Sequence, residues 1–407
     1  MKIKKYYLYP LLFYKVFPNL STINLSPFAF LFLLLDLRFT ISKLRSFYIN
    51  LWIPNISFAL LLIFQITLHG ISLSILKSFI LTYCSIFGGL YLAFKISELR
   101  PKIILAIFSF YYLLISIINL SPPEGNIYFK RNYSALSGLT GFGGLSTPVL
   151  FYGILLSAVA FKKTYKKILS IFIISFLFIM SLSNTDFLIY MIGLLVFPII
   201  ILFTSFKQTR LFFEKVVFNK YGIYLLFLII SILSALCLVF LKDIFDTEIF
   251  VLLDGASSFR LSLASEAYKS FLNSKLINII FGHGLGIGYI NLSNNSELIS
   301  NFWNEKSKMI HNSFLTIIYD TGILGAILIF NTFAYIFTKI WTKTISISHS
   351  FSNKNNNKFF KSYIYLCLIC VFCVFVSFAG VDKYTDLLTY TIIFLSPLTL
   401  IKARYNL

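Results

Sequence analysis

Long apolar runs separated by short polar gaps make up most of the chain. Many of these runs reach or approach the length of about 20 residues with which an α-helix crosses a bilayer. The pattern therefore predicts an all-α polytopic membrane protein with about twelve transmembrane helices. The predicted crossings are residues 7–20, 23–37, 51–68, 74–94, 103–120, 135–161, 168–183, 187–205, 221–241, 309–338, 362–380 and 385–401.

The first two predicted crossings are the least regular. Both are short, and Pro10, Pro18 and Pro27 interrupt them. Because proline kinks or ends a helix, the two runs also fit a single bent segment. That alternative would move the amino terminus to the other side of the membrane.

Composition agrees with the pattern. Of the 407 residues, 58% are hydrophobic and 12% are charged, which lies far outside the range of soluble domains. No internal repeat is apparent, and we interpret residues 1–407 as a single integral membrane domain.

The net charge of +20 is concentrated in the short gaps between the apolar runs. With the predicted crossings, these basic gaps fall on one side, as the positive-inside rule expects of a cytoplasmic face. Both termini then lie in the cytoplasm. No basic groove or aromatic stacking module is visible, so nucleic acid is not expected as a partner.

Three cysteines, Cys367, Cys370 and Cys373, have a spacing that could suggest metal ligands. They lie in an apolar run with no histidine or acidic residue nearby, so we interpret them as small apolar residues on one helix face. We expect no disulfide and no metal. The amino-terminal apolar segment lacks a small-residue cleavage site, and we expect it to be retained.

The longest polar segment, residues 242–308, is predicted to be a large loop on the outer side. It contains an amphipathic helical pattern that starts near Arg260. A guanidinium at that place can bind two oxygens of a phosphate. The alternative is an exposed arginine that covers the apolar flank of the helix.

Further along this loop, residues 282–288 form a glycine run. No strand precedes the run and it faces outward, so it is not expected to bind a nucleotide. We interpret it as a turn that lets the backbone pass close to another segment. His283 within it is expected to be structural.

His311 is the leading candidate for catalysis. It lies beside Asn312 at the start of an apolar helix, and its neutral imidazole can accept a proton near pH 7. The alternative is an interfacial histidine without chemistry. Asp320 lies about half a turn out of phase on the same helix, so it cannot orient His311 from there. Gly322 and Ala326 are interpreted as a small-residue pair that permits close helix packing.

Arg131 and its neighbour Lys130 are the other candidate cations. They end an outer segment and precede a stretch rich in glycine and serine that is too polar to face lipid. A helix entrance that faces a lumen fits this stretch. The alternative for the two cations is a pair whose charged ends reach the membrane interface.

The order of these features resembles the O-antigen ligase and O-antigen polymerase superfamily of bacterial envelope glycosyltransferases. The resemblance covers about residues 100–400 and is most specific over residues 257–325. The segments that carry it are Arg131 with the glycine- and serine-rich stretch, Ser257-Ser258-Phe259-Arg260, Phe281-Gly282-His283-Gly284-Leu285-Gly286, His311-Asn312-Ser313-Phe314-Leu315 and Tyr319-Asp320-Thr321-Gly322-Ile323-Leu324-Gly325.

The resemblance implies a twelve-helix protein of the bacterial inner membrane with a large periplasmic loop. The implied donor is a glycan on undecaprenyl diphosphate, transferred with inversion and without a metal or another cofactor. By position, Arg131 and Arg260 would hold the diphosphate, with Lys130 and Asn312 as further substrate contacts. His311 would assist the acceptor hydroxyl at the periplasmic face. Expected partners are the lipid-linked oligosaccharide, membrane lipids, a chain-length regulator and a flippase.

One departure from the family pattern bears on the acceptor. Many members have Ser-Arg after the seventh crossing, where this chain has Ser183-Asn184. The missing arginine favours a polymerase, which adds the chain to another lipid-linked repeat unit, over a ligase, which transfers it to lipid A-core. A flippase for lipid-linked oligosaccharides is a third reading. It would need polar residues spread through the helix centres, whereas here they gather in one outer loop.

Overall fold

Helices form most of the part of the chain that the computed structural model describes. These described residues are 24–107, 109–110, 146–180, 206–229, 232, 260–286, 289–291, 307–309, 312–349, 357–379 and 387–403. The exception to the helices is a ribbon of two antiparallel strands, β1 (Tyr289–Asn291) and β2 (Ser307–Met309), in which Tyr289 pairs with Met309. The prediction of a helical protein is confirmed apart from this ribbon.

Among the described residues, three helices are long and apolar enough to cross a membrane. They are α5 (Trp52–His69), α6 (Leu73–Ser97) and residues 313–347 of α18 (Ser313–His349). The other helices of the bundle are α3 (Ser26–Leu35), α9 (Ser146–Ala160), α10 (Thr164–Met180), Lys220–Ile229, α19 (Asn357–Ala379) and α20 (Leu387–Ala403). The crossings predicted at residues 7–20 and 187–205 lie outside the described residues, so the number of crossings stays a prediction.

Helix α6 packs tightly between α3 and α20. A Cβ atom at Gly88 would lie 2.9 Å from Ala29 Cβ, and one at Gly89 would lie 2.7 Å from Tyr390 Cβ. Adjacent glycines therefore let α6 approach both neighbours more closely than any larger residue would allow. This kind of small-residue contact is common between membrane helices, where packing replaces the hydrophobic effect as the driving force.

The second predicted crossing, residues 23–37, corresponds to α3 but ends in a bend. Asp36 has φ −106° and ψ 40°, outside the helical region, and α4 (Leu37–Ser46) follows it. Helix α4 buries Thr40 and Leu44 and carries basic residues in its last turn. What the sequence indicated as a basic gap is therefore an amphipathic helix that continues from α3.

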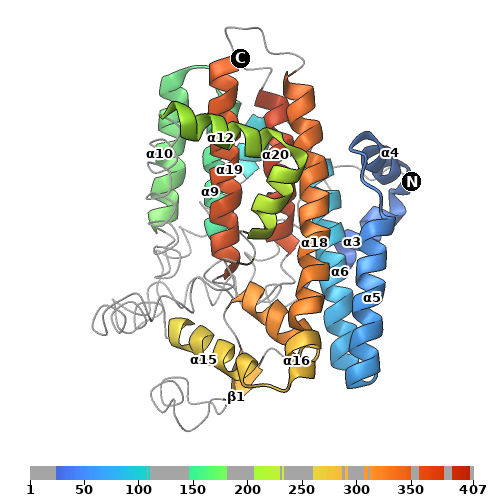
Figure 1. Cartoon of the computed structure of the whole chain (residues 1–407). Helices are drawn as coiled ribbons and strands as arrows, with labels where there is room; N and C mark the ends of the chain where they lie inside the picture. The colour runs from blue at the N-terminus through green and yellow to red at the C-terminus, as the bar shows by residue number, and fades with distance from the viewer. Residues whose placement is uncertain are drawn as a thin grey trace, which may run out of the picture.

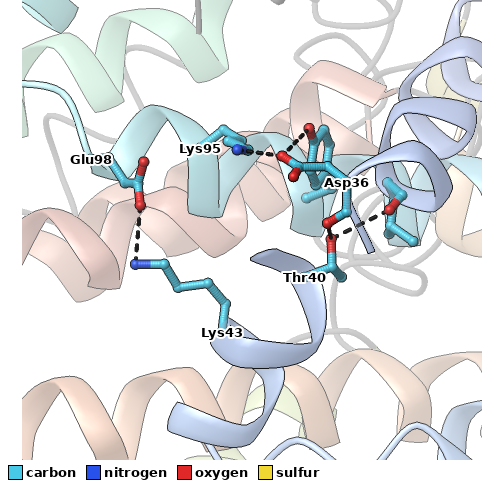
Figure 2. Close-up of polar contacts among 7 residues, drawn as sticks. Asp36, Thr40, Lys43, Lys95 and Glu98 are labelled. Carbon is cyan, nitrogen blue, oxygen red and sulfur yellow. Dashed lines mark hydrogen bonds and ion pairs between the residues drawn. The ribbon is translucent and has the colours of Figure 1, made fainter. Parts of the chain in front are cut away.

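A buried ion pair joins this bend to α6. The Lys95 ammonium contacts the Asp36 carboxylate, and both side chains are 4% exposed. Tyr91 Oη donates to Asp36 Oδ2 over 3.3 Å, and Lys95 Nζ lies 3.6 Å from the centroid of the Phe39 ring. Figure 2 shows the pair that Asp36, at the start of α4, forms with Lys95 of α6. Lys95 is one of the basic residues between the crossings predicted at 74–94 and 103–120, where the sequence pattern predicts an exposed cation. That expectation is wrong for Lys95, which is buried and paired.

Basic segments that are distant in the sequence meet at one end of the bundle. Helix α12 (Lys207–Phe218) lies across this end (Figure 1). Trp341 Nε1 of α18 donates to Val217 O over 2.9 Å, and Lys343 Nζ lies 4.9 Å from the Tyr48 ring centroid. This gathering agrees with the predicted single basic face, while its assignment to the cytoplasm stays a prediction.

Helix α18 is broken near its start. Gly322 has φ 67° and ψ −177°, so the helical backbone is interrupted between residues 313–321 and the long remainder. The sequence predicted one continuous crossing over residues 309–338. It also interpreted Gly322 with Ala326 as a small-residue pair that permits close helix packing. Gly322 does allow a close approach, to the backbone of Ile280 in α16, but it does so at the break rather than within a continuous helix.

The short first segment of α18 lies at the end of the molecule opposite the basic face. It packs there with α15 (Arg260–Leu272) and α16 (Leu276–Phe281), as Figure 1 shows. We refer to α15, α16 and residues 313–321 as the outer unit. Part of the outer unit forms a small core of its own, while Phe314 and Ile317 in the first segment of α18 belong to the main core of the bundle.

Candidate functional site

The glycine run joins the outer unit to the bundle at the break in α18. His283 N donates to Tyr319 O over 3.0 Å, and Gly284 N donates to Asp320 O over 2.9 Å. The two carbonyl groups lie just before Gly322, where the helix can no longer provide their usual partners four residues on. The glycine run therefore supplies the hydrogen bonds that the break leaves unmade.

Gly282 and Gly322 make this contact possible. Both have a positive φ, 84° and 67°. A Cβ on Gly282 would overlap Asp320 O, and a Cβ on Gly322 would overlap Ile280 O. Only glycine fits at both positions, because each backbone passes directly over the other. The sequence prediction of a turn that brings the backbone close to another segment is confirmed.

His283 is held on both ring nitrogens. Its Nδ1 lies 3.1 Å from Tyr319 O and its Nε2 lies 2.9 Å from Ser274 Oγ. Because a carbonyl oxygen can only accept, Nδ1 carries the hydrogen of its bond to Tyr319. The Ser274 hydroxyl beside Nε2 also donates to Ser270 O over 2.7 Å. The ring also stacks on Tyr319, with centroids 4.2 Å apart and 12° between the planes. These contacts agree with the structural role predicted for His283.

Two buried polar side chains complete the docking. Asp320 Oδ2 accepts a hydrogen bond from Gly286 N over 3.0 Å. Gln65, in the middle of an apolar run of α5, donates to Phe281 O over 2.8 Å and accepts from Leu285 N over 2.9 Å. Sequence reasoning missed Gln65, although an amide within a membrane crossing is a usual sign of a specific contact.

The outer unit brings two helix starts to one small core. Its members are Leu263, Ala264, Ala267, Phe271, Leu315 and Tyr319. Helix α15 begins at Arg260, three residues before Leu263, and α18 begins after Asn312, three residues before Leu315. The helices that start at Arg260 and after Asn312 therefore pack on each other.

Asn312 has a clear structural role. It is buried, and its Oδ1 accepts hydrogen bonds from Phe314 N at 3.1 Å and Leu315 N at 3.0 Å. This is the usual way in which asparagine caps the start of a helix. The sequence analysis proposed Asn312 as a substrate contact. The structure shows a side chain whose oxygen is used to fix the first turn of α18.

The remaining candidate side chains are not among the described residues. Arg131, Lys130 and His311 lie outside them, and of Arg260 only the backbone at the start of α15 is described. Their predicted roles stay predictions. Among the described residues, no three His, Cys, Asp or Glu side chains lie close enough together to hold a metal ion.

A helix start carries partial positive charge from its unpaired N–H groups. Helix α15 has no acidic residue in its first turn, and neither does α18. At α18, Asn312 already occupies two of these N–H groups. The residues before α15 lie outside the described part of the chain, so an anion site at Arg260 stays a prediction.

One comparison with known proteins finds a match in this region. The family model described as O-antigen ligase matches residues 169–330. No curated protein and no solved structure matches the chain. The family match confirms, for this part of the chain, the resemblance to the O-antigen ligase and polymerase superfamily. The matched residues contain the whole outer unit as well as Arg260, His311 and Asn312, whereas Arg131 and Lys130 lie before them.

Proposed function

We propose that this protein is a membrane glycosyltransferase that moves a glycan from undecaprenyl diphosphate to an acceptor hydroxyl at the outer face of the membrane. The family match supports a transferase of the O-antigen ligase and polymerase type. The observation that carries the proposal is the packing of the helix that starts at Arg260 on the helix that starts after Asn312, within the matched residues.

The reaction places separate demands on the two helix starts. The bond between the anomeric carbon of the glycan and the diphosphate oxygen breaks, and the acceptor oxygen attacks that carbon from the opposite side. Arg260 and Arg131, with Lys130, stabilise the diphosphate as it leaves, because fixed cations bind the developing charge without reorganising. His311, next to the cap of α18, takes the proton of the acceptor hydroxyl.

We propose a second lipid-linked repeat unit as the acceptor, which makes the protein a polymerase. The absence of Ser-Arg at residues 183–184 supports this choice. Transfer to lipid A-core is the second candidate, because the matched family model is described as O-antigen ligase. Deletion of the gene distinguishes the two. Core carrying one repeat unit indicates a polymerase, whereas naked core with accumulated lipid-linked polymer indicates a ligase.

Substitutions at the two helix starts test the proposed site. We expect Arg260→Ala and His311→Ala to abolish long-chain polysaccharide on a gel while the protein still inserts into the membrane. Arg260→Lys should give more product than Arg260→Ala but less than the parent protein, because a lysine ammonium cannot bind two phosphate oxygens side by side as a guanidinium does.

Lys269→Ala is the matched control for Arg260→Ala. Lys269 is on the same helix and is 57% exposed, and it forms only a 3.8 Å pair with Glu266. Its loss removes the same charge from α15 without touching the start of the helix, so the polysaccharide ladder should be unchanged. A normal ladder from both Arg260→Ala and His311→Ala would remove these residues from the site.

A further inference from the structure

Gln65 connects a membrane helix to both sides of the glycine turn. The side chain is 1% exposed. Its amide nitrogen donates to Phe281 O, the last residue of α16, and its amide oxygen accepts from Leu285 N. One side chain thus binds the backbone immediately before Gly282 and immediately after Gly284.

These bonds satisfy groups that have no other obvious partner in their own element. Phe281 O lies at the carboxyl end of α16, where helix carbonyls lack intrahelical donors. Leu285 is fully buried, and a buried backbone N–H without a partner is costly. The Gln65 amide lies in an apolar helix and also needs hydrogen-bond partners. The amide and the backbone of the turn therefore satisfy each other.

The glycine turn adds polar contacts to the apolar ones between the outer unit and the bundle. Phe314 and Ile317 of the outer unit belong to the main core, and the Phe281 ring lies 5.5 Å from the Phe64 ring of α5. Because α18 passes through non-helical backbone at Gly322, the helix alone does not fix the orientation of residues 313–321. The bonds from Gln65 to both sides of the turn contribute to that orientation.

We propose that Gln65 is a positioning residue for the transfer reaction. By clamping the turn around Gly282, it fixes the outer unit on the bundle and so holds the start of α15 and the start of α18 in their reactive arrangement. The proposal rests on the proposed function for the reaction, whereas the clamp itself can be measured without any substrate.

The first experiment measures the clamp directly. Leu285→Cys is introduced into full-length protein whose native cysteines, Cys84, Cys237, Cys367, Cys370 and Cys373, are replaced by alanine. The purified protein in lipid nanodiscs is treated with a hydrophilic maleimide. Leu285 is buried, so labelling should be slow. Adding Gln65→Ala should accelerate it about tenfold, because two hydrogen bonds that close the turn are lost.

Thr67→Ala is the matched control. Thr67 is an exposed residue two positions along the same helix, and its hydroxyl bonds only to Ile63 O of that helix, 2.8 Å away. It should leave labelling and polysaccharide unchanged. Each variant is also checked for the same amount of protein in the membrane, so that a loss of product is not a loss of protein.

The second experiment uses Gln65→Glu in cells. A protonated carboxyl has the shape of the amide and can donate to Phe281 O and accept from Leu285 N, whereas an ionised one cannot donate. Burial favours the protonated form. The polysaccharide yield relative to the parent protein should therefore be near normal at acidic external pH and fall as the pH rises.

Other titratable groups around Gln65 are common to the parent and the variant. They are His69 on α5, His283 in the glycine run and Asp320 on α18. Dividing the polysaccharide yield of the variant by that of the parent protein at each pH removes the contribution of these groups. Thr67→Glu, which carries a carboxyl on the exposed side of α5, should show a ratio that does not depend on pH.

Each outcome decides the proposal. Faster labelling in Gln65→Ala together with less long-chain product supports it. Unchanged labelling in Gln65→Ala would show that Gln65 does not hold the turn. Faster labelling with a full polysaccharide ladder would show that the clamp does not position the reaction. Either result overturns the proposal. If deletion of the gene leaves the polysaccharide intact, the proposed function fails and the reaction part of the proposal fails with it, while the labelling still decides the clamp.

Discussion

At the scale of single residues, Gly282 and Gly322 decide whether the outer unit can dock. We expect Gly282→Ala and Gly322→Ala to lower the stability of the protein, by at least about 2 kcal/mol more than a positive φ alone would cost. The added Cβ would overlap backbone atoms, which cannot move aside as a side-chain end can. Thermal unfolding of the purified protein in detergent measures the effect.

Gly70→Ala separates the two causes. Gly70 also has a positive φ, 74°, but among the described residues no atom lies within 4 Å of the place where its Cβ would be. This variant should lose only the cost of backbone strain, about 1–3 kcal/mol. Equal melting temperatures for the three variants would mean that the close approach of the glycines contributes nothing.

Sequence reasoning at this scale succeeded where a residue acts locally. The closeness of the glycine run to another backbone and the structural role of His283 followed from residue type and neighbours. Gln65 was missed because its partners are more than 200 positions away in the chain. Asn312 was predicted to contact the substrate, whereas its side chain caps α18. Asparagine directly before an apolar helix is a recognised capping signal.

At the scale of elements, the ion pair between Asp36 and Lys95 holds the α3–α4 bend against α6. Removing one partner leaves a charge buried without its counterion, which costs about 3–5 kcal/mol. We therefore expect Lys95→Met to lower the melting temperature strongly. The double variant Asp36→Leu with Lys95→Met should recover most of the loss, because no buried charge remains.

A neighbouring ion pair serves as the control. Lys43 Nζ lies 3.3 Å from Glu98 Oε1, and the two side chains are 33% and 28% exposed; Figure 2 shows both pairs together. A pair that reaches solvent contributes at most about 1 kcal/mol, so Lys43→Met should change the melting temperature little. If the double variant at Asp36 and Lys95 melts no higher than Lys95→Met, the unpaired buried charge is not the cause of the lost stability.

Element boundaries followed the hydrophobic pattern closely where a helix crosses the bundle without interruption. Residues 51–68 and 74–94 were predicted, and the helices run over Trp52–His69 and Leu73–Ser97. The break in α18 was not predicted. A glycine inside an apolar run costs a helix only about 1 kcal/mol, so the pattern continues through Gly322, and the segment that docks there comes from an earlier part of the chain.

At the scale of the whole molecule, the basic end and the outer unit should lie on opposite sides of the membrane. We expect Ile71→Cys to react with a membrane-impermeant maleimide in spheroplasts, because Ile71 is 76% exposed next to the end of α5 that contacts the outer unit. Lys163→Cys, exposed between α9 and α10, should react only after permeabilisation.

The result depends on the positive-inside interpretation of the basic gaps. Reaction of Lys163→Cys in intact spheroplasts, with Ile71→Cys protected, would reverse the topology and place the outer unit in the cytoplasm. The class of the protein and its basic face could be predicted from the sequence, because both depend on composition and on the positions of charges. The division into a bundle and an outer unit could not, because it depends on a backbone contact between two glycines.

The interruption at Gly322 also bears on how such a protein can diversify. In an unbroken helix, one inserted residue rotates everything beyond it by about 100°, so changes outside the membrane would disturb every packed face within it. Here the helical hydrogen bonding stops before the bundle begins. Loops on the outer side of the break can therefore be lengthened or exchanged, while the part of the protein inside the lipid keeps its register.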